Sequence, residues 1–141
     1  MAPNPSYELI DHTADFGIRV CGSSAKDLFH NAALALMDQL VEAVAPRERQ
    51  TRQLKIAGND WPDLMVNWLR EILYLWAGEE MLVRAIQIEA LTPSRLSAQL
   101  DAEVFSPQHH IIRTEIKAVT YHQIQVVDRG HCWEARIIFD I

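Results

Sequence analysis

Residues 60–78 read DWPDLMVNWLREILYLWAG, and this stretch carries the strongest amphipathic pattern in the chain. Its large apolar residues recur at the spacings i, i+3, i+4 and i+7, which is the period of one helix face. Asp60 is a good N-cap, Pro62 suits the first turn, and Gly78 suits the position after the last turn. We therefore predict a helix over 60–78 whose tryptophans pack in the core rather than serve as a ligand platform.

A second helix is predicted on the N-terminal side of this stretch, over residues 24–43. Leu28, Leu36 and Leu40, with alanines between them, follow helical spacing. Ser24 can act as the N-cap, with Asp27 three residues later in place of the usual glutamate of a capping box. We expect the helix to have ended by Pro46, because proline cannot continue the hydrogen-bond ladder.

The rest of the chain has the period of two that is typical of strands. Before and between the helices we predict strands at 7–10, 16–21 and 53–57. After the second helix we predict strands at 82–90, 96–104, 112–120, 123–127 and 133–141. This order favours an α+β fold, a two-layer single domain over 1–141 with two helices packed on a mainly antiparallel β-sheet and residues 1–6 as a short lead-in. No Gly-x-Gly-x-x-Gly follows the first strand, so nothing in the sequence supports a dinucleotide-binding fold.

Composition narrows the class of protein. The chain has 141 residues and a net charge of −6, so it differs from the basic domains that grip nucleic-acid phosphates over a broad surface. Cys21 and Cys132 do not make a disulfide framework, and we expect two free buried thiols. Without a targeting signal or an apolar run of about 18–20 residues, a cytoplasmic protein without a membrane span is expected.

The polar run His12-Thr13-Ala14-Asp15-Phe16-Gly17 joins the first two predicted strands. Such residues suit a hairpin connection, but they also place a carboxylate and an imidazole together. At the far end of the chain, Asp140 precedes the terminal carboxylate of Ile141. If the first and last strands meet, Asp15 and Asp140 would form a set of hard oxygen ligands that suits Mg²⁺, Ca²⁺ or Mn²⁺. His12 could add a nitrogen ligand. The alternative is a simple turn and a solvated strand end.

Lys117 is a further candidate, on the predicted polar strand face with Arg113 and Glu115. These side chains could form a solvated charge ladder, or Lys117 could lie near the carboxylates and contact a phosphate or an acidic group. The sequence contains no zinc-binding spacing and no nucleophile motif, so no catalytic residue is assigned.

Four segments together resemble the archease family, in the order and at the spacing found in that family. They are His-Thr-Ala-Asp-x-Gly at 12–17, Asn-Trp-Leu-Arg-Glu-Ile-Leu-Tyr-Leu at 67–75, Ile-Lys-Ala-Val-Thr-Tyr-His at 116–122, and Ile-Phe-Asp-Ile at 138–141. The resemblance covers nearly the whole chain.

The resemblance implies a function that composition does not give. Archeases are accessory proteins of the RtcB-type RNA ligase in tRNA splicing and RNA repair, and they promote ligase guanylylation and multiple turnover. The implied ligands of a divalent cation are Asp15, Asp140 and the terminal carboxylate of Ile141, with Ca²⁺ favoured and Mg²⁺ or Mn²⁺ as alternatives. Lys117 matches the family's lysine, and little direct contact with nucleic acid is expected. The competing classes are a free-standing metal-dependent phosphoester or nucleotide hydrolase and a metal-independent, chaperone-like binding module.

Overall fold

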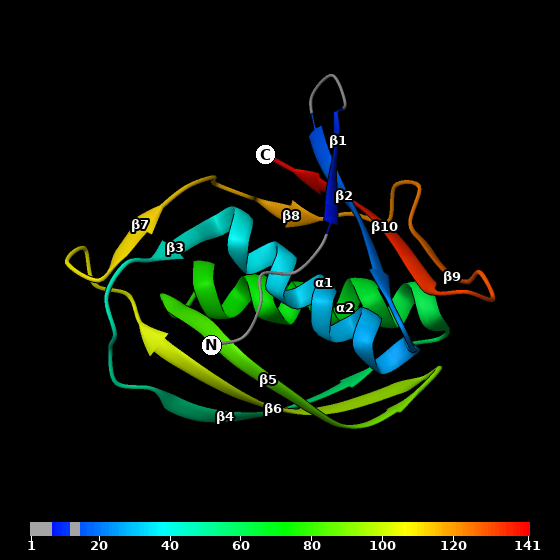
Figure 1. Cartoon of the computed structure of the whole chain (residues 1–141), viewed down its shortest axis with the longest axis horizontal. Coiled ribbons are helices and arrows are strands. Elements are labelled where there is room, and N and C mark those ends of the chain that lie inside the picture. The colour runs from blue at the N-terminus through cyan, green and yellow to red at the C-terminus, as the bar shows by residue number, and fades with distance from the viewer. Residues whose placement is uncertain (1–6, 12–14) are drawn as a thin grey trace.

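A computed structural model of the chain describes the backbone of residues 7–11 and 15–141, and the side chains of 7–10 and 16–141. The described residues form two helices. Figure 1 shows that the helices lie in the middle of the molecule, with strands above and below them. The helices are α1 (Ala25–Leu40) and α2 (Trp61–Ala77). Neither helix in the described part combines the length and apolar character that a membrane span needs.

Helix α1 begins with the predicted capping arrangement. The Ser24 hydroxyl accepts a hydrogen bond from the Asp27 N–H at 3.1 Å, and the Asp27 carboxylate accepts one from the Ser23 N–H at 2.8 Å. The helix ends three residues earlier than predicted. Val41 is extended, with φ −158° and ψ 147°, and it begins β3 (Val41–Ala43). Pairing with β7 (His110–Ile112) fixes this extended conformation, which the local sequence does not reveal.

Helix α2 matches its prediction within one residue at each end. Asp60 caps it by accepting the Asp63 N–H at 2.9 Å. Trp68 is fully buried, and its indole N–H donates to the Phe29 carbonyl at 2.9 Å, which ties α2 to α1. Gly78 ends the helix with a φ of −95°, and the left-handed conformation falls on Glu80 instead, at φ 54°.

The strands form three antiparallel sheets. The largest has the order β1-β2-β10-β8, and β9 pairs with the other end of β10. Its strands are β1 (Tyr7–Asp11), β2 (Asp15–Gly22), β8 (Ala118–Val119), β9 (Gln125–Asp128) and β10 (Trp133–Asp140). A second sheet has the order β4-β6-β5, formed by β4 (Gln50–Ala57), β5 (Met81–Thr92) and β6 (Arg95–Val104). The third consists of β3 and β7.

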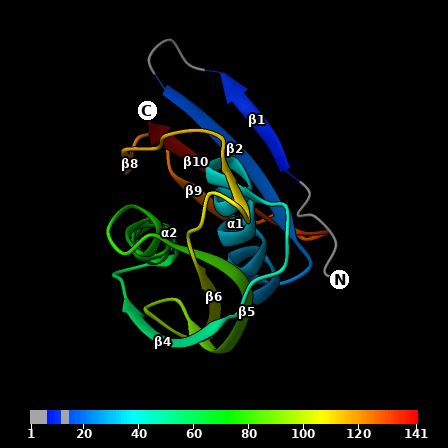
Figure 2. The ribbon, with the colours of Figure 1, turned by 90° about the vertical axis from the view of Figure 1, so that its left-hand side faces the viewer.

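The α+β class with mainly antiparallel strands is confirmed, and the strands divide into three sheets rather than one. In Figures 1 and 2 both helices lie between the five-stranded sheet and the three-stranded sheet. Helix α1 contacts β2 on one side and β5 on the other. Ala32, Ala33, Ala35 and Leu36 are all fully buried, since α1 is covered on two sides.

The predicted strand over 112–120 is wrong as a continuous element. The chain leaves β7 at Ile112 and forms only the short strand β8 at 118–119. Between them, the Arg113 N–H donates to the Leu40 carbonyl and the Thr114 N–H to the Gln39 carbonyl, at 2.9 and 3.1 Å. The segment therefore satisfies carbonyls at the end of α1 instead of pairing with a strand.

Two burial predictions also need correction. The alternation in β6 predicts a buried Val104 and a solvated Glu103, but Glu103 is 2% exposed and Val104 is 38% exposed. Buried polar partners hold the Glu103 carboxylate inside, as described below. Of the two cysteines, Cys21 is exposed and Cys132 is half-buried, so the expectation of two buried thiols is wrong.

Candidate functional site

Strands β2 and β10 meet along their whole length, as the predicted cation site requires. In their register Asp140 lies opposite Asp15, and Phe139 lies opposite Phe16. The rings of Phe16 and Phe139 are in contact, with centroids 5.5 Å apart. The structure therefore brings the backbones of Asp15 and Asp140 side by side, although they come from opposite ends of the chain.

Gly17 permits the close approach of these strands. A Cβ atom at this position would lie 2.6 Å from both the Ile137 carbonyl oxygen and the Cδ1 atom of Ile138. Such distances are shorter than real carbon contacts, so a side chain here would push β10 away. The glycine of the His12–Gly17 stretch thus has a packing role beside the turn role that its sequence suggests.

Lys117 lies on the other side of β10. Its N–H donates to the Asp140 carbonyl at 2.7 Å, and the next residue, Ala118, is the register partner of Asp140. The Lys117 side chain is exposed and makes no ion pair with any described residue. Asp15, Asp140 and Lys117 are therefore neighbours across three strands at one end of the sheet.

The predicted charge ladder around Lys117 does not form. Arg113 turns toward the end of α1 and the start of β3, where its guanidinium pairs with the carboxylates of Asp38 at 2.9 Å and Glu42 at 3.2 Å. The reason is the path of residues 113–117, which follows the end of α1 and not a strand. Lys117, whose backbone is bonded to that of Asp140, is thereby separated from Arg113 and has no ion pair with any described residue.

The donor atoms at this sheet end fit a hard divalent cation. Asp140 and Ile141 are exposed, and among the described residues no basic side chain pairs with the Asp140 carboxylate. An exposed carboxylate such as that of Asp140, with no cationic partner among the described residues, is the kind of hard oxygen ligand that Ca²⁺, Mg²⁺ or Mn²⁺ takes. The side chain of Asp15 and all of His12 lie outside the described residues. Within the described part, no group of three or more acidic, histidine or cysteine side chains is close enough to hold a metal ion.

A hollow of about 280 Å³ lies beside Lys117, between α2 and β8. Apolar side chains of both elements line it, together with the cations Arg70 and Lys117 and the exposed Tyr74. The Arg70 Nε–H donates to the Val119 carbonyl at 3.2 Å, and its guanidinium carbon lies 4.7 Å from the centre of the Tyr121 ring. Arg70 is thus held against the edge of the five-stranded sheet.

Tyr121 connects this region to the start of α2. Its hydroxyl donates to the Asp63 carboxylate at 2.7 Å. This hydrogen bond, together with one from the Asn59 N–H, holds the pKa of Asp63 below its usual range, and the same bond raises the pKa of Tyr121. Sequence reasoning assigned no role to Arg70 or Tyr121. The one sequence feature that points to these two residues is that both lie within segments that resemble the archease family.

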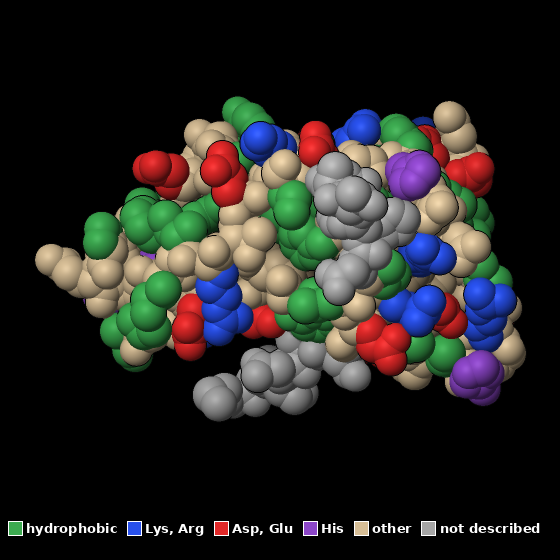
Figure 3. Space-filling view, turned by 90° about the horizontal axis from the view of Figure 1, so that it is seen from above, with side chains coloured by type: hydrophobic (Ala, Val, Ile, Leu, Met, Phe, Trp, Pro, Cys, Tyr) green, Lys and Arg blue, Asp and Glu red, His purple; other side chains and the backbone are tan. Residues whose placement is uncertain are grey.

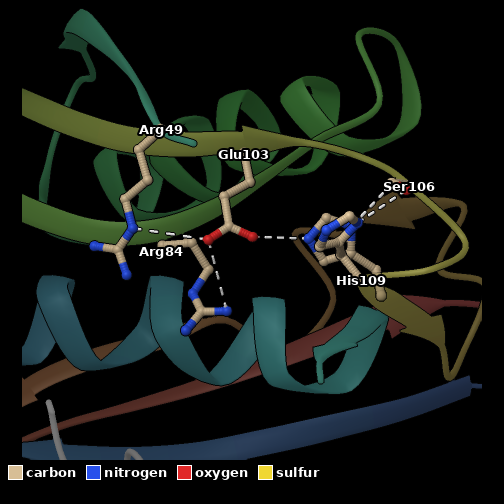
Figure 4. Close-up of polar contacts among 6 residues, drawn as sticks. Arg49, Arg84, Glu103, Ser106 and His109 are labelled. Carbon is tan, nitrogen blue, oxygen red and sulfur yellow. Dashed lines mark hydrogen bonds and ion pairs between the residues drawn. The ribbon is translucent and has the colours of Figure 1, made fainter. Parts of the chain in front are cut away.

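A second polar cluster is buried near β6, and Figure 4 shows its contacts. The Ser106 N–H donates to Nδ1 of His110 at 3.0 Å, so the proton of this imidazole is on Nε2. Nε2 is 2.8 Å from the Glu103 carboxylate, whose other oxygen lies 3.7 Å from Arg49 and 4.0 Å from Arg84. Every member has partners, which explains why Glu103 is buried and indicates a structural tie for residues 105–110.

The surface around the β1–β2 end carries both signs of charge. In Figure 3, acidic and basic side chains alternate over the described part of this face, and hydrophobic side chains gather at the end formed by β3 and β7. Three aliphatic side chains there are about half exposed: Val44, Ile111 and Ile112. The face differs from the continuous basic surface that binds nucleic-acid backbones.

A model of the archease protein family matches residues 7–141, which is nearly the whole chain. The chain belongs to the archease family. The resemblance that the four segments carry is therefore confirmed over every element described above.

Curated archeases are similar to this chain in length and sequence. The archease of Methanosarcina mazei is 31% identical over 139 residues, which covers 96% of this chain and 95% of that protein. The archease of Sulfurisphaera tokodaii is 29% identical over 136 residues, covering 96% and 98%.

Solved structures of archeases have the same fold. A solution structure of a Methanobacterium thermoautotrophicum protein is 28% identical, covers 96% of this chain and 98% of that one, and gives a TM-score of 0.72. An archease of Thermotoga maritima, described as a possible chaperone, is 18% identical with a TM-score of 0.65 over 95% and 96% of the two chains. The second likeness concerns the fold alone.

Proposed function

We propose that this protein activates an RtcB-type RNA ligase in tRNA splicing and RNA repair, by promoting guanylylation of the ligase and its multiple turnover. Membership of the archease family supports the proposal. The single structural observation that carries it is the register that makes Asp15, Asp140 and Lys117 neighbours at one end of the sheet. Such a constellation on an acidic protein suits action on another protein's nucleotide pocket better than binding of an RNA backbone.

The proposed cation ligands are Asp15, Asp140 and the terminal carboxylate of Ile141. A divalent cation held there would supply positive charge to phosphate oxygens at the interface with the ligase. The hydrogen bond from the Lys117 N–H to the Asp140 carbonyl fixes β8 beside β10 and so sets the position from which the Lys117 ammonium can reach an anionic group. The chain itself provides no catalytic residue in this scheme, so it acts as an activator and not as an enzyme.

The test is ligase guanylylation measured with wild-type protein and with Asp15→Asn, Asp140→Asn and Lys117→Met variants. Each variant is expected to lose most of the stimulation, because each removes one charge from the constellation. Lys26→Met and Glu48→Gln are matched controls, since both residues are exposed and make no ion pair with a described residue. Full stimulation by all three site variants would exclude the proposal.

A chaperone-like binding module is the second candidate, favoured by the half-exposed aliphatic side chains of β3 and β7 and by the description of the Thermotoga maritima archease. This candidate predicts that the protein still stimulates the ligase after a chelator has removed its divalent cations. It also predicts that Ile111→Ser and Ile112→Ser abolish stimulation while Asp140→Asn does not. Hydrolysis of a nucleotide panel by the isolated protein would instead indicate the free-standing hydrolase.

A further inference from the structure

The hollow between α2 and β8 has an apolar floor. Leu73 and Val119 are 6% and 1% exposed, and Ala77 and Ala118 complete the lining between them. In Figure 2 helix α2 and strand β8 lie on the same side of the molecule, one below the other. Tyr74 stands at the rim, 59% exposed, which is unusual for a large aromatic side chain on an otherwise well-packed helix. The apolar surface that the hollow offers to a partner therefore comes from the exposed Tyr74 and Ala77 and the half-buried Ala118, above the buried Leu73 and Val119.

Two cations border this floor, and neither forms an ion pair with a carboxylate of the described residues. Two arginines elsewhere on the surface are paired with carboxylates: Arg19 lies 3.1 Å from Glu8, and Arg113 lies 2.9 Å from Asp38. Among the described residues, the Arg70 guanidinium hydrogen-bonds only through Nε–H to the Val119 carbonyl and rests on Tyr121, with the charge of Asp63 nearby but no ion pair to it, so its two terminal nitrogens remain available. A guanidinium fixed in this way loses little further freedom when it binds a carboxylate. Lys117 adds a second cation from the opposite side.

We propose that this hollow docks a segment of the partner protein in which an aliphatic or aromatic side chain is flanked by acidic residues. The apolar side chain would occupy the floor of Leu73 and Val119, and the carboxylates would pair with Arg70 and Lys117. The partner's identity rests on the proposed function, since the ligase is the protein that this chain would contact. The chemistry of the docking segment comes from the hollow itself, through the match of its cations to carboxylates.

A nucleotide fits the hollow less well. At about 280 Å³ the hollow is smaller than most small-molecule sites. Its floor of alanine, leucine and valine side chains has no polar groups to pair with the edge of a base, and unpaired buried donors and acceptors are costly. These observations favour a protein segment.

The experiment measures the Kd of the full-length chain for the purified ligase by calorimetry, with Arg70→Gln and Ala77→Glu variants. Arg70→Gln is expected to raise Kd about tenfold or more, because it removes a charge-assisted pair. Ala77→Glu is expected to raise the Kd further, because the glutamate side chain would fill the hollow and its charge would repel the acidic segment of the partner. Arg95→Gln is the matched control, because Arg95 is exposed and has no ion pair with a described residue, and it lies on the β5–β6 turn. Thermal melts verify that each variant is folded.

A photo-crosslinking residue in place of Tyr74 then identifies the partner segment by mass spectrometry, with the same residue at Ile111 as the control position. An acidic segment with an apolar side chain, captured from position 74 only, is the expected result. Unchanged Kd values for both variants, or a captured segment without acidic residues, would overturn the docking site while leaving ligase activation intact. Chemical-shift changes at Ala118 and Val119 on addition of guanosine monophosphate, absent in Arg70→Gln, would overturn it in favour of a nucleotide.

The proposed function fails in a different way. If the wild-type chain neither binds nor stimulates the ligase, both inferences fall together. If Asp140→Asn removes stimulation but leaves Kd unchanged, while Arg70→Gln raises Kd, the docking hollow and the cation constellation are separate parts of one surface. Stimulation by Arg70→Gln is then expected to recover at high protein concentration, which a structural defect would not allow.

Discussion

Asp140 of β10 lies directly opposite Asp15 of β2 in an antiparallel register that continues for eight residue pairs. The pair stands at the end of both strands, where the backbone of Lys117 also joins through the Asp140 carbonyl. Directly opposed acidic residues destabilise a strand pair unless a cation intervenes. This relationship is the physical reason for expecting a cation at this end of the sheet.

Removal of the Asp140 charge is therefore expected to abolish divalent cation binding. Calorimetric titration of the wild-type protein with CaCl2, MgCl2 and MnCl2 should show one site, and Asp140→Asn should weaken it by at least about tenfold, because one of a few oxygen ligands loses its charge. The Glu48→Gln variant should match the wild type. Equal cation affinity in Asp140→Asn and wild type would contradict the proposed ligand set.

Gly17→Ala is expected to destabilise the fold by about 1–3 kcal/mol, the usual cost of overpacking. The new Cβ would meet the Ile137 carbonyl and the Ile138 side chain at 2.6 Å and force β2 and β10 apart. Urea denaturation measures the free energy of unfolding, and amide chemical shifts of β10 report the displacement. Gly130→Asn is the comparison: Gly130 has a φ of 92°, but a Cβ there meets no atom within 4 Å. A stability loss no larger than that of the comparison would show that the strands adjust freely.

His110→Ala is expected to lower the free energy of unfolding by about 3 kcal/mol. The change leaves the Glu103 carboxylate short of a buried donor, leaves the Ser106 N–H without its acceptor, and creates a cavity. His131→Ala, at an exposed position, should change stability by less than about 0.5 kcal/mol. Chemical denaturation of both variants at one pH makes the comparison, and similar values for the two would refute a structural role for the buried cluster.

Tyr121→Phe is expected to raise the pKa of Asp63 toward its ordinary value. The Tyr121 hydroxyl hydrogen bond is the main cause of the lowered pKa in the folded protein. A carboxyl group whose pKa is lower in the folded state than in the unfolded state stabilises the fold at pH values above the unfolded-state pKa. This stabilisation is lost as the pH falls through the folded-state pKa. A carbon-detected NMR titration of the Asp63 carboxyl group should therefore show its midpoint moving upward in the variant. An unmoved midpoint would mean that the Asn59 N–H and the charge of Arg70 hold the Asp63 pKa down without Tyr121.

Tyr7→Phe tests how the stability of the fold depends on pH in the alkaline range. Burial, followed by the hydrogen bond to Asp38, raises the pKa of Tyr7 to about 12. Because the folded pKa is above the unfolded value of about 10, the stabilisation is complete below pH 10 and is lost as the pH rises toward 12. The variant should be less stable by about 1 kcal/mol at pH 8, with the difference fading above pH 10. Chemical denaturation of the wild type and the variant at a series of pH values measures their free energies of unfolding. A difference between the two that stays constant with pH would contradict a raised pKa for Tyr7.

The sequence by itself determined the parts of this protein that depend on nearby residues. The apolar period of 61–76 and the caps Ser24 and Asp60 define the two helices, since capping bonds and helix faces join residues three or four positions apart. The alternation in 96–102 defines the buried face of β6 in the same way. The four family segments also identify the archease family, which no single period or cap could do.

Only the tertiary structure decided which distant residues meet. The partners of Arg113 and Thr114 are carbonyls at the end of α1, so a segment with strand-like alternation is not a strand. Glu103 is buried because Arg49, Arg84 and His110 converge on it from other elements. Arg70 and Lys117 border one hollow only because β8 lies along α2. Local patterns fix local hydrogen bonds, whereas long-range pairing depends on the packing of the whole chain, and that packing places Asp15 beside Asp140.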